Sequence, residues 1–207
     1  MDTNSEKNME KAILEVAEQL FLEKGFDATS TTQIAKAVGC NQALVHYYFR
    51  TKDNLFNTIF ESKFKDFFQH IFDGFEVQNL NFTDKIAHFS ISHFNLLIAN
   101  PQMPQLVLNE LARKPENINA ICEKLHLLPE EMASTLNAEL QEEIAAGRVR
   151  NVTLIDIITT VLSLNVALFT MMPIASKALK MNDTSILLML NHRKEENLKV
   201  ILGYLRP

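Results

Sequence analysis

The sequence predicts an all-α protein with a three-helix, helix-turn-helix domain at the N-terminus and a larger helical domain after it. Apolar residues recur at helical spacing along most of the 207 residues. Only 5 Gly and 6 Pro are present, too few for the many turns of an all-β fold. Two short amphipathic runs separated by Gly39 give the helix-turn-helix pattern.

The first helix is predicted over residues 8–24, where apolar side chains form one stripe. Its members are Ala12, Ile13, Val16, Ala17, Leu20 and Phe21. Gly25 follows directly and is a typical helix end.

The next two helices surround a tight turn. Ser30 precedes Gln33 by three residues, which is a capping-box pattern and predicts a helix start near Thr31. Gly39 ends that helix at little steric cost, and Asn41 is a good N-cap for the second. In the second helix we expect Val45, Tyr48 and Phe49 to face inward. We expect Gln42, Ala43 and His46 to face outward, with Leu44 and Tyr47 on either side of them.

The run GFDATSTTQIAKAVGCNQALVHYYFRTKDNLF, from Gly25 to Phe56, resembles the DNA-binding domain of TetR-family transcriptional regulators. The resemblance covers about a quarter of the chain in detail, and a looser similarity continues at Ala145–Ile157. It departs from the family pattern where His46 replaces a usual Tyr, Ala43 a frequent Gly, Leu44 a small polar residue and Thr31 an apolar one.

The second helix of such a motif enters the major groove. Gln42, Leu44 and His46 are the candidates for base edges, since Gln can pair with adenine and Leu can contact a thymine methyl. The resemblance implies phosphate contacts at Tyr47, Lys52 and the cluster Thr29, Ser30, Thr31 and Thr32. Arg50 can add a charge contact. In the alternative interpretation Tyr47 only packs and His46 is only solvated.

The remaining helices are predicted from spacing and caps. A long helix from residue 52 to 72 links a domain at 1–51 to a domain at 52–207, and a loop follows at 73–82. Thr83 is the expected cap of a helix that ends near Ala99. The further helices are expected at 104–113, 116–126, 129–146, 154–172 and 183–204.

The last two helices are the predicted homodimer surface, over residues 152–173 and 183–205. The apolar segment 152–175 contains Asp156, Asn165 and Pro173, which a membrane span tolerates poorly. Two antiparallel helices from each subunit can bury it as a four-helix bundle. A two-fold dimer places its recognition helices about 34–36 Å apart, which predicts a palindromic operator.

A small-molecule pocket is expected in the second domain, because sites between helices combine apolar walls with a few polar anchors. Ordinary core packing is the alternative for each residue. The candidate lining is Phe89, His93, Phe94, Met103, Asn165, Phe169 and Met172. The resemblance implies that a ligand bound there shifts the linking helix and releases the operator.

Charge and motifs limit the other functions. The net charge is −5, yet residues 28–52 hold no acidic residue and three basic ones: Lys36, Arg50 and Lys52. We found no catalytic set, cofactor motif or metal spacing, so we expect neither an enzyme nor a cofactor. A cytoplasmic protein is expected from the polar N-terminus and two separated cysteines. The alternative function is a helical small-molecule-binding protein or enzyme with no DNA-binding role.

Overall fold

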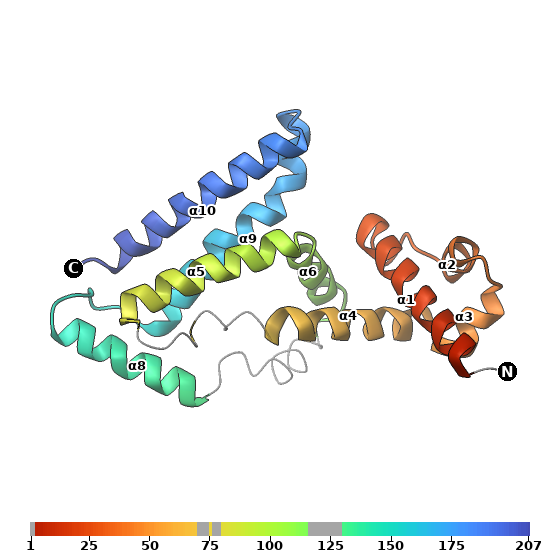
Figure 1. The fold of residues 1–207 in the computed structure, drawn as a ribbon, viewed down its shortest axis with the longest axis horizontal. Helices are drawn as coiled ribbons and strands as arrows, with labels where there is room; N and C mark the ends of the chain where they lie inside the picture. The colour runs from red at the N-terminus through yellow and green to blue at the C-terminus, as the bar shows by residue number, and fades with distance from the viewer. Residues whose placement is uncertain (1–2, 70–74, 76–79, 116–129) are drawn as a thin grey trace. The chain divides into compact units, whose positions relative to one another are not determined.

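The computed structural model describes residues 3–69, 75, 80–115 and 130–207, and the regular elements within them are helices (Figure 1). The chain divides into two compact units, residues 1–66 and 67–207. The all-α prediction is confirmed. The functional boundary predicted after residue 51 stays a prediction.

The N-terminal unit contains α1 (Thr3–Lys24), α2 (Thr31–Val38), α3 (Gln42–Phe49) and most of α4 (Lys52–Gln69). α1 begins five residues earlier than predicted. Apolar residues from all four helices, two long and two short, pack into one core that stabilises the unit. The buried residues include Ile13, Ala17, Phe21, Ile34, Ala35, Val45, Phe49, Leu55, Phe56, Ile59 and Phe60.

Local signals fix the two short helices. The Ser30 side chain accepts from the backbone N–H of Gln33, and the Gln33 side chain accepts from the N–H of Ser30. Gly39 ends α2 with a φ of 82°, a left-handed value that favours glycine. The Asn41 side chain accepts from the N–H of Leu44 and starts α3. The predicted capping box, turn and N-cap are therefore confirmed.

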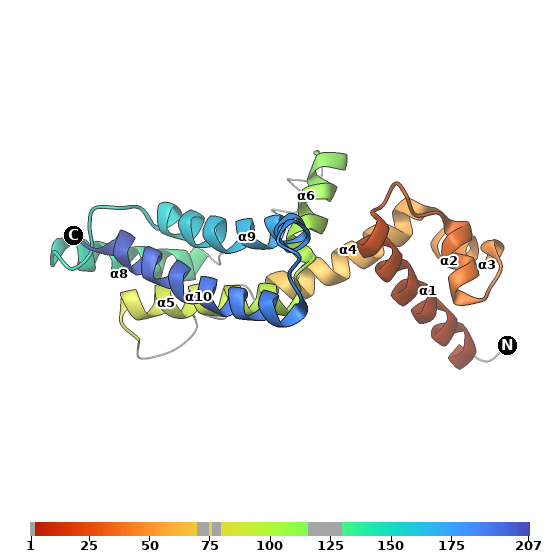
Figure 2. The same ribbon diagram turned by 90° about the horizontal axis from the view of Figure 1, so that it is seen from above.

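The C-terminal unit is built on three long helices, α5 (Phe82–Ala99), α9 (Leu154–Ala178) and α10 (Asp183–Leu205). Each of the three packs against the other two, as both views show (Figures 1 and 2). α6 (Met103–Arg113) packs on α9, and α8 (Glu130–Ala145) packs on α5 and α9.

Two boundary predictions changed. Asn81, not Thr83, caps α5, because its side chain accepts from the N–H of Asp84. α9 does not stop before Pro173 but continues to Ala178. A proline inside a helix removes one backbone hydrogen bond and crowds the carbonyl four residues earlier, but the helix continues here through alanine and lysine residues of good helix propensity. The helices predicted at 116–126 and from Pro129 begin outside the described residues.

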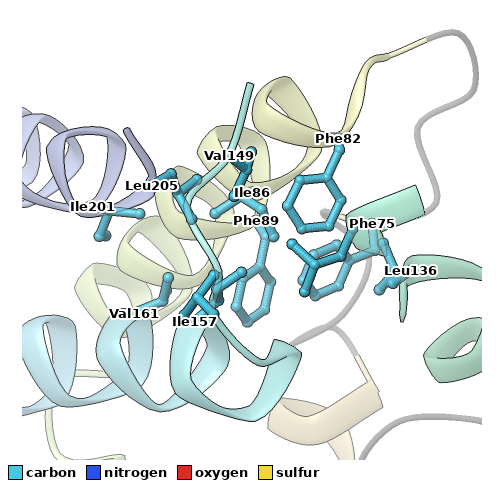
Figure 3. Packing of buried hydrophobic residues seen from close by; sticks show 12 residues of the cluster. Phe75, Phe82, Ile86, Phe89, Leu136, Val149, Ile157, Val161, Ile201 and Leu205 are labelled. Carbon is cyan, nitrogen blue, oxygen red and sulfur yellow. The ribbon is translucent and has the colours of Figure 1, made fainter. Parts of the chain in front are cut away.

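Apolar residues from α5, α8, α9 and α10 form the main core of the C-terminal unit. Figure 3 shows Phe89 of α5 packed with Ile157 and Val161 of α9, and with Ile201 of α10 nearby. Within the described residues, α9 is the helix that is long and apolar enough to cross a membrane by length and composition. It is a core helix here, because its buried face lies in this cluster.

Candidate nucleic-acid interface and buried polar network

α3 exposes most of the residues predicted to face DNA. Gln42, Ala43 and His46 are exposed, and 62 % of the Tyr47 surface is accessible. Leu44 is half-buried, which leaves part of its side chain at the surface. Val45 and Phe49 are buried as predicted, whereas Tyr48 is half-buried. The exposed face of α3 therefore presents a tyrosine beside polar side chains, which are groups that can form hydrogen bonds with DNA.

The Gln42 amide connects α3 to α2. Its Oε1 accepts from the Thr32 hydroxyl at 3.0 Å, and its Nε2 donates to Thr31 Oγ1 at 3.1 Å. The same Nε2 lies 3.2 Å from Nε2 of His46. Four polar residues predicted to contact DNA separately therefore form one hydrogen-bonded set in the protein.

The backbone determines the tautomer of His46. Nδ1 of His46 lies 2.9 Å from the carbonyl oxygen of Arg50, and a carbonyl can only accept. Nδ1 therefore carries the hydrogen and donates it. In a neutral ring Nε2 is then an acceptor, so the group facing it must be the Gln42 NH₂. The orientation of the Gln42 amide follows from this contact.

An unusual turn presents the Arg50 carbonyl. Arg50 has a φ of 64° and a ψ of −55°, and the N–H of Thr51 donates to the Phe49 carbonyl at 2.6 Å. This three-residue hydrogen bond defines a γ-turn of the strained kind. Strain at a non-glycine residue persists where the surrounding structure fixes it, and such residues cluster at functional sites.

Two predicted phosphate contacts have different positions in the structure. Thr29 is only 1 % exposed, and its hydroxyl makes hydrogen bonds with the carbonyls of Leu20 and Gly25. Its side chain cannot reach a phosphate, so that prediction was wrong. Lys52 Nζ donates to the carbonyls of Phe26 and Thr29 at 3.0 Å each.

Lys52 also lies over the ring of Phe26, with Nζ 4.1 Å from the ring centroid. The lysine thus fixes the loop between α1 and α2, a role that sequence reasoning missed. Its phosphate contact stays a prediction. Ser30, Thr32, Lys36 and Arg50 are exposed, and Thr31 is half-buried.

The predicted pocket residues lie in the interior of the C-terminal unit. Phe89, His93, Phe94, Met103, Asn165 and Phe169 are buried, and Met172 is half-buried. The structure brings some of them into contact: the ring of Phe94 meets Phe169 edge to face at 5.4 Å, and His93 lies near Phe89.

A chain of hydrogen bonds crosses this interior from α10 to α5. Arg193 donates to Oδ1 of Asn197, and Nδ2 of Asn197 donates to Oδ1 of Asn165 at 3.0 Å. Nδ2 of Asn165 donates to the Ser90 carbonyl at 3.0 Å and to Nδ1 of His93 at 3.2 Å. Each amide is oriented, because Asn197 and Asn165 also donate to the backbone carbonyls of Leu164 and Ser90.

This series of hydrogen bonds and the burial of the ring determine the protonation state and the tautomer of His93. Burial lowers the pKa of His93 to about 4, so the ring is neutral near pH 7. Nδ1 accepts from Asn165, so the hydrogen is on Nε2. Among the described residues, no hydrogen bond is made by that Nε2–H. Sequence reasoning missed Arg193 and Asn197, although Asn197 occupies an apolar position of α10 four residues before Ile201.

Comparison with known proteins supports the helix-turn-helix assignment and the overall fold. Residues 13–59 match the model for the tetR family of bacterial regulatory proteins. The HTH-type transcriptional regulator QacR of Staphylococcus aureus is 39 % identical over 62 residues, which cover 28 % of this chain and 33 % of that protein. The chain therefore matches about one third of this relative's length.

Solved structures share the fold over nearly the whole chain. The ketosteroid transcriptional regulator KstR2 of Mycobacterium tuberculosis has a TM-score of 0.68 at 15 % identity, covering 96 % of this chain and 95 % of that one. The regulator FadR of Bacillus subtilis in complex with stearoyl-CoA has a TM-score of 0.63 at 17 % identity, covering 95 % and 99 %.

The fold of the N-terminal unit and the exposed face of α3 place this protein in the class of helix-turn-helix proteins. Within that class, the chain is similar to TetR-family transcriptional regulators: residues 13–59 match the family model, and the whole fold resembles solved structures of such regulators. Proteins of this family are regulators and not enzymes, which agrees with the prediction from sequence. The groups of three or more His, Cys, Asp or Glu that could hold a metal are absent from the described residues.

Proposed function

We propose that this protein is a dimeric repressor that binds a palindromic operator and is released by a small amphipathic ligand. The single observation that carries the DNA-binding half is the exposed face of α3, with Gln42 and His46 in one polar set beside the exposed ring of Tyr47. A recognition helix needs such a face to contact base edges and phosphates.

The surrounding surface supplies phosphate contacts. Ser30, Thr31 and Tyr47 offer hydroxyl groups, and Lys36 and Arg50 offer exposed charges. These groups give affinity that depends on salt, because each neutralised phosphate releases counterions. Leu44 and Ala43 add apolar contact. Thr29 is not included, because its hydroxyl is used inside the domain.

Dimerisation through α9 and α10 is supported by apolar side chains that this single chain leaves exposed. Ile155 and Leu188 are each 66 % exposed, and other large apolar residues are exposed on the same two helices: Met171, Ile174, Leu187 and Val200. A soluble monomer rarely exposes so much apolar surface together. A second copy of the chain can cover it as a four-helix bundle.

The ligand half of the proposal is supported by the interior of the C-terminal unit. Apolar rings and one oriented polar chain are the mixture that small-molecule sites use. The series of hydrogen bonds from Arg193 ends at the Nε2–H of His93, which is a donor. We therefore expect a ligand that combines an apolar body with a hydrogen-bond acceptor. The ligand must prefer the conformation that cannot span both half-sites, or it cannot release DNA.

A function without DNA is disfavoured, because the helix-turn-helix domain carries the family match. A cytoplasmic location follows from the proposal, since the operator lies there.

The test is release of bound DNA. The purified full-length chain is bound to fluorescent DNA from upstream of its own coding region, and candidate ligands are titrated. Stearoyl-CoA and free stearate are the first probes, because the relative of known structure binds stearoyl-CoA. Release by a ligand from wild type, but not from a His93→Phe variant with unchanged DNA affinity, supports the proposal. DNA binding that no acceptor-bearing ligand changes contradicts its ligand half.

A further inference from the structure

The hydrogen-bonding capacity of Gln42 is almost fully used inside the protein. A glutamine amide has two N–H donors and one carbonyl oxygen with two lone pairs. Thr31 Oγ1 and His46 Nε2 accept the two donors, and the Thr32 hydroxyl occupies one lone pair. One lone pair on Oε1 is left for an external partner.

His46 has no hydrogen-bonding capacity left. A neutral imidazole has one donor and one acceptor. The donor, Nδ1–H, binds the Arg50 carbonyl at 2.9 Å, and the acceptor, Nε2, faces the Gln42 amide at 3.2 Å. Although His46 is exposed on α3, its ring cannot form a hydrogen bond with a base edge unless these two contacts break.

We infer that Gln42 alone reads a base by hydrogen bonding, through Oε1, and that His46, Thr31 and Thr32 are positioning residues that hold its amide. This inference rests on the proposed DNA-binding function. It replaces a set of separate contacts with one reading group and three supports.

The chemistry of the available lone pair defines the base. In the major groove, adenine presents the amino group N6 and cytosine the amino group N4, whereas guanine and thymine present acceptors at the corresponding edge. Oε1 of Gln42 can therefore form a hydrogen bond with adenine or with cytosine, but not with guanine or thymine. The familiar two-bond pairing of glutamine with adenine also needs an amide N–H for N7, and both N–H groups are used.

The γ-turn at Arg50 sets the whole arrangement. Its backbone brings a carbonyl to the end of α3, and that carbonyl selects the His46 tautomer. The tautomer then orients the Gln42 amide. The position of this carbonyl against His46 gives a physical reason for the positive φ of residue 50.

The experiment is selection from a randomised duplex DNA library by the purified full-length chain, followed by sequencing. For wild type we expect one half-site position that accepts adenine and cytosine about equally on one strand. His46→Phe releases one N–H of Gln42, and Thr31→Val releases the other. Each variant can then form the two-bond pair, so each is expected to prefer adenine over cytosine about tenfold at that position only.

Lys36→Ala is the matched control, because it removes an exposed charge from α2 without touching Gln42. It is expected to weaken all sequences equally. A cooperative unfolding transition, followed by circular dichroism, verifies that each variant is folded at the start. If wild type enriches no sequence, the regulator proposal fails and the inference fails with it.

The inference alone is overturned, with the regulator proposal intact, by any of three results. These are a half-site without an adenine-or-cytosine position, a preference in His46→Phe and Thr31→Val that stays as in wild type, and a change at a different base position.

Discussion

Nδ2 of Asn197 in α10 donates a hydrogen bond to Oδ1 of Asn165 in α9, across 3.0 Å of the buried interior. Both side chains are buried, and each satisfies every polar group it carries through Arg193, Leu164, Ser90 and His93. Buried polar groups are tolerated when they are fully hydrogen-bonded. This contact therefore connects α5, α9 and α10 in one arrangement.

Asn165→Asp tests that arrangement with almost no change of shape. The carboxylate places an oxygen against the Ser90 carbonyl and buries a charge, so we expect stability to fall by about 3 kcal/mol. Urea unfolding followed by circular dichroism measures the change. Asn95→Asp is the control, since Asn95 is exposed and accepts from Lys194, and it should change little. Equal effects from the two variants would show that the buried chain has no special importance.

His93 makes stability depend on pH. Its pKa is lowered by burial from 6.5 to about 4, so between these values the unfolded chain binds a proton that the folded chain does not. Its contribution is complete above pH 6.5 and is lost as pH falls towards 4, by on the order of 3 kcal/mol. His93→Gln should flatten this part of the profile, and the exposed His192→Gln should leave it as in wild type.

Arg50→Gly should stabilise the N-terminal unit by about 1 kcal/mol, because glycine adopts a positive φ without strain. The same change at Lys36, within α2, should destabilise by about 1 kcal/mol. The chain has no Trp and 3 Tyr, of which Tyr47 and Tyr48 are in α3. Tyrosine fluorescence in a Tyr204→Phe background therefore reports unfolding of this unit. A loss of stability in Arg50→Gly would mean that the turn is not strained.

The dimer proposal predicts that Leu188→Glu gives a monomer. A charge on each copy of an exposed apolar position disfavours burial between two copies. Sedimentation velocity measures the state, and affinity for DNA with two half-sites should fall at least tenfold. Leu108→Glu, an exposed position on α6, is the control and should remain a dimer. A dimeric Leu188→Glu protein would place the interface elsewhere.

Local sequence signals were enough to predict the helices of the N-terminal unit. The capping box at Ser30, the turn at Gly39 and the N-cap at Asn41 depend only on neighbouring residues, and each is present. Asn165 could be identified as a polar residue in an apolar helix. Its partner Asn197 could not, because the hydrogen bond joins residues 32 positions apart, and sequence spacing carries no record of such contacts.

Thr29 and Lys52 show why a motif does not define the role of each side chain. Both belong to the predicted DNA-contacting set, yet Thr29 is buried and Lys52 holds the carbonyls of Phe26 and Thr29. Lys52→Ala is therefore expected to lower both stability and DNA affinity. A loss of binding in that variant would not identify a phosphate contact, so Tyr47 is the better residue for a DNA-binding test.

The most direct test of DNA recognition through α3 is fluorescence anisotropy with DNA from upstream of the coding region, against scrambled DNA, over a salt series. Tyr47→Ala removes an exposed ring and should leave stability unchanged. We predict tight, salt-dependent binding of wild type to the upstream DNA, weakened at least tenfold in Tyr47→Ala. The absence of binding to any DNA at low salt, or equal binding by the folded Tyr47→Ala variant, would contradict recognition through α3.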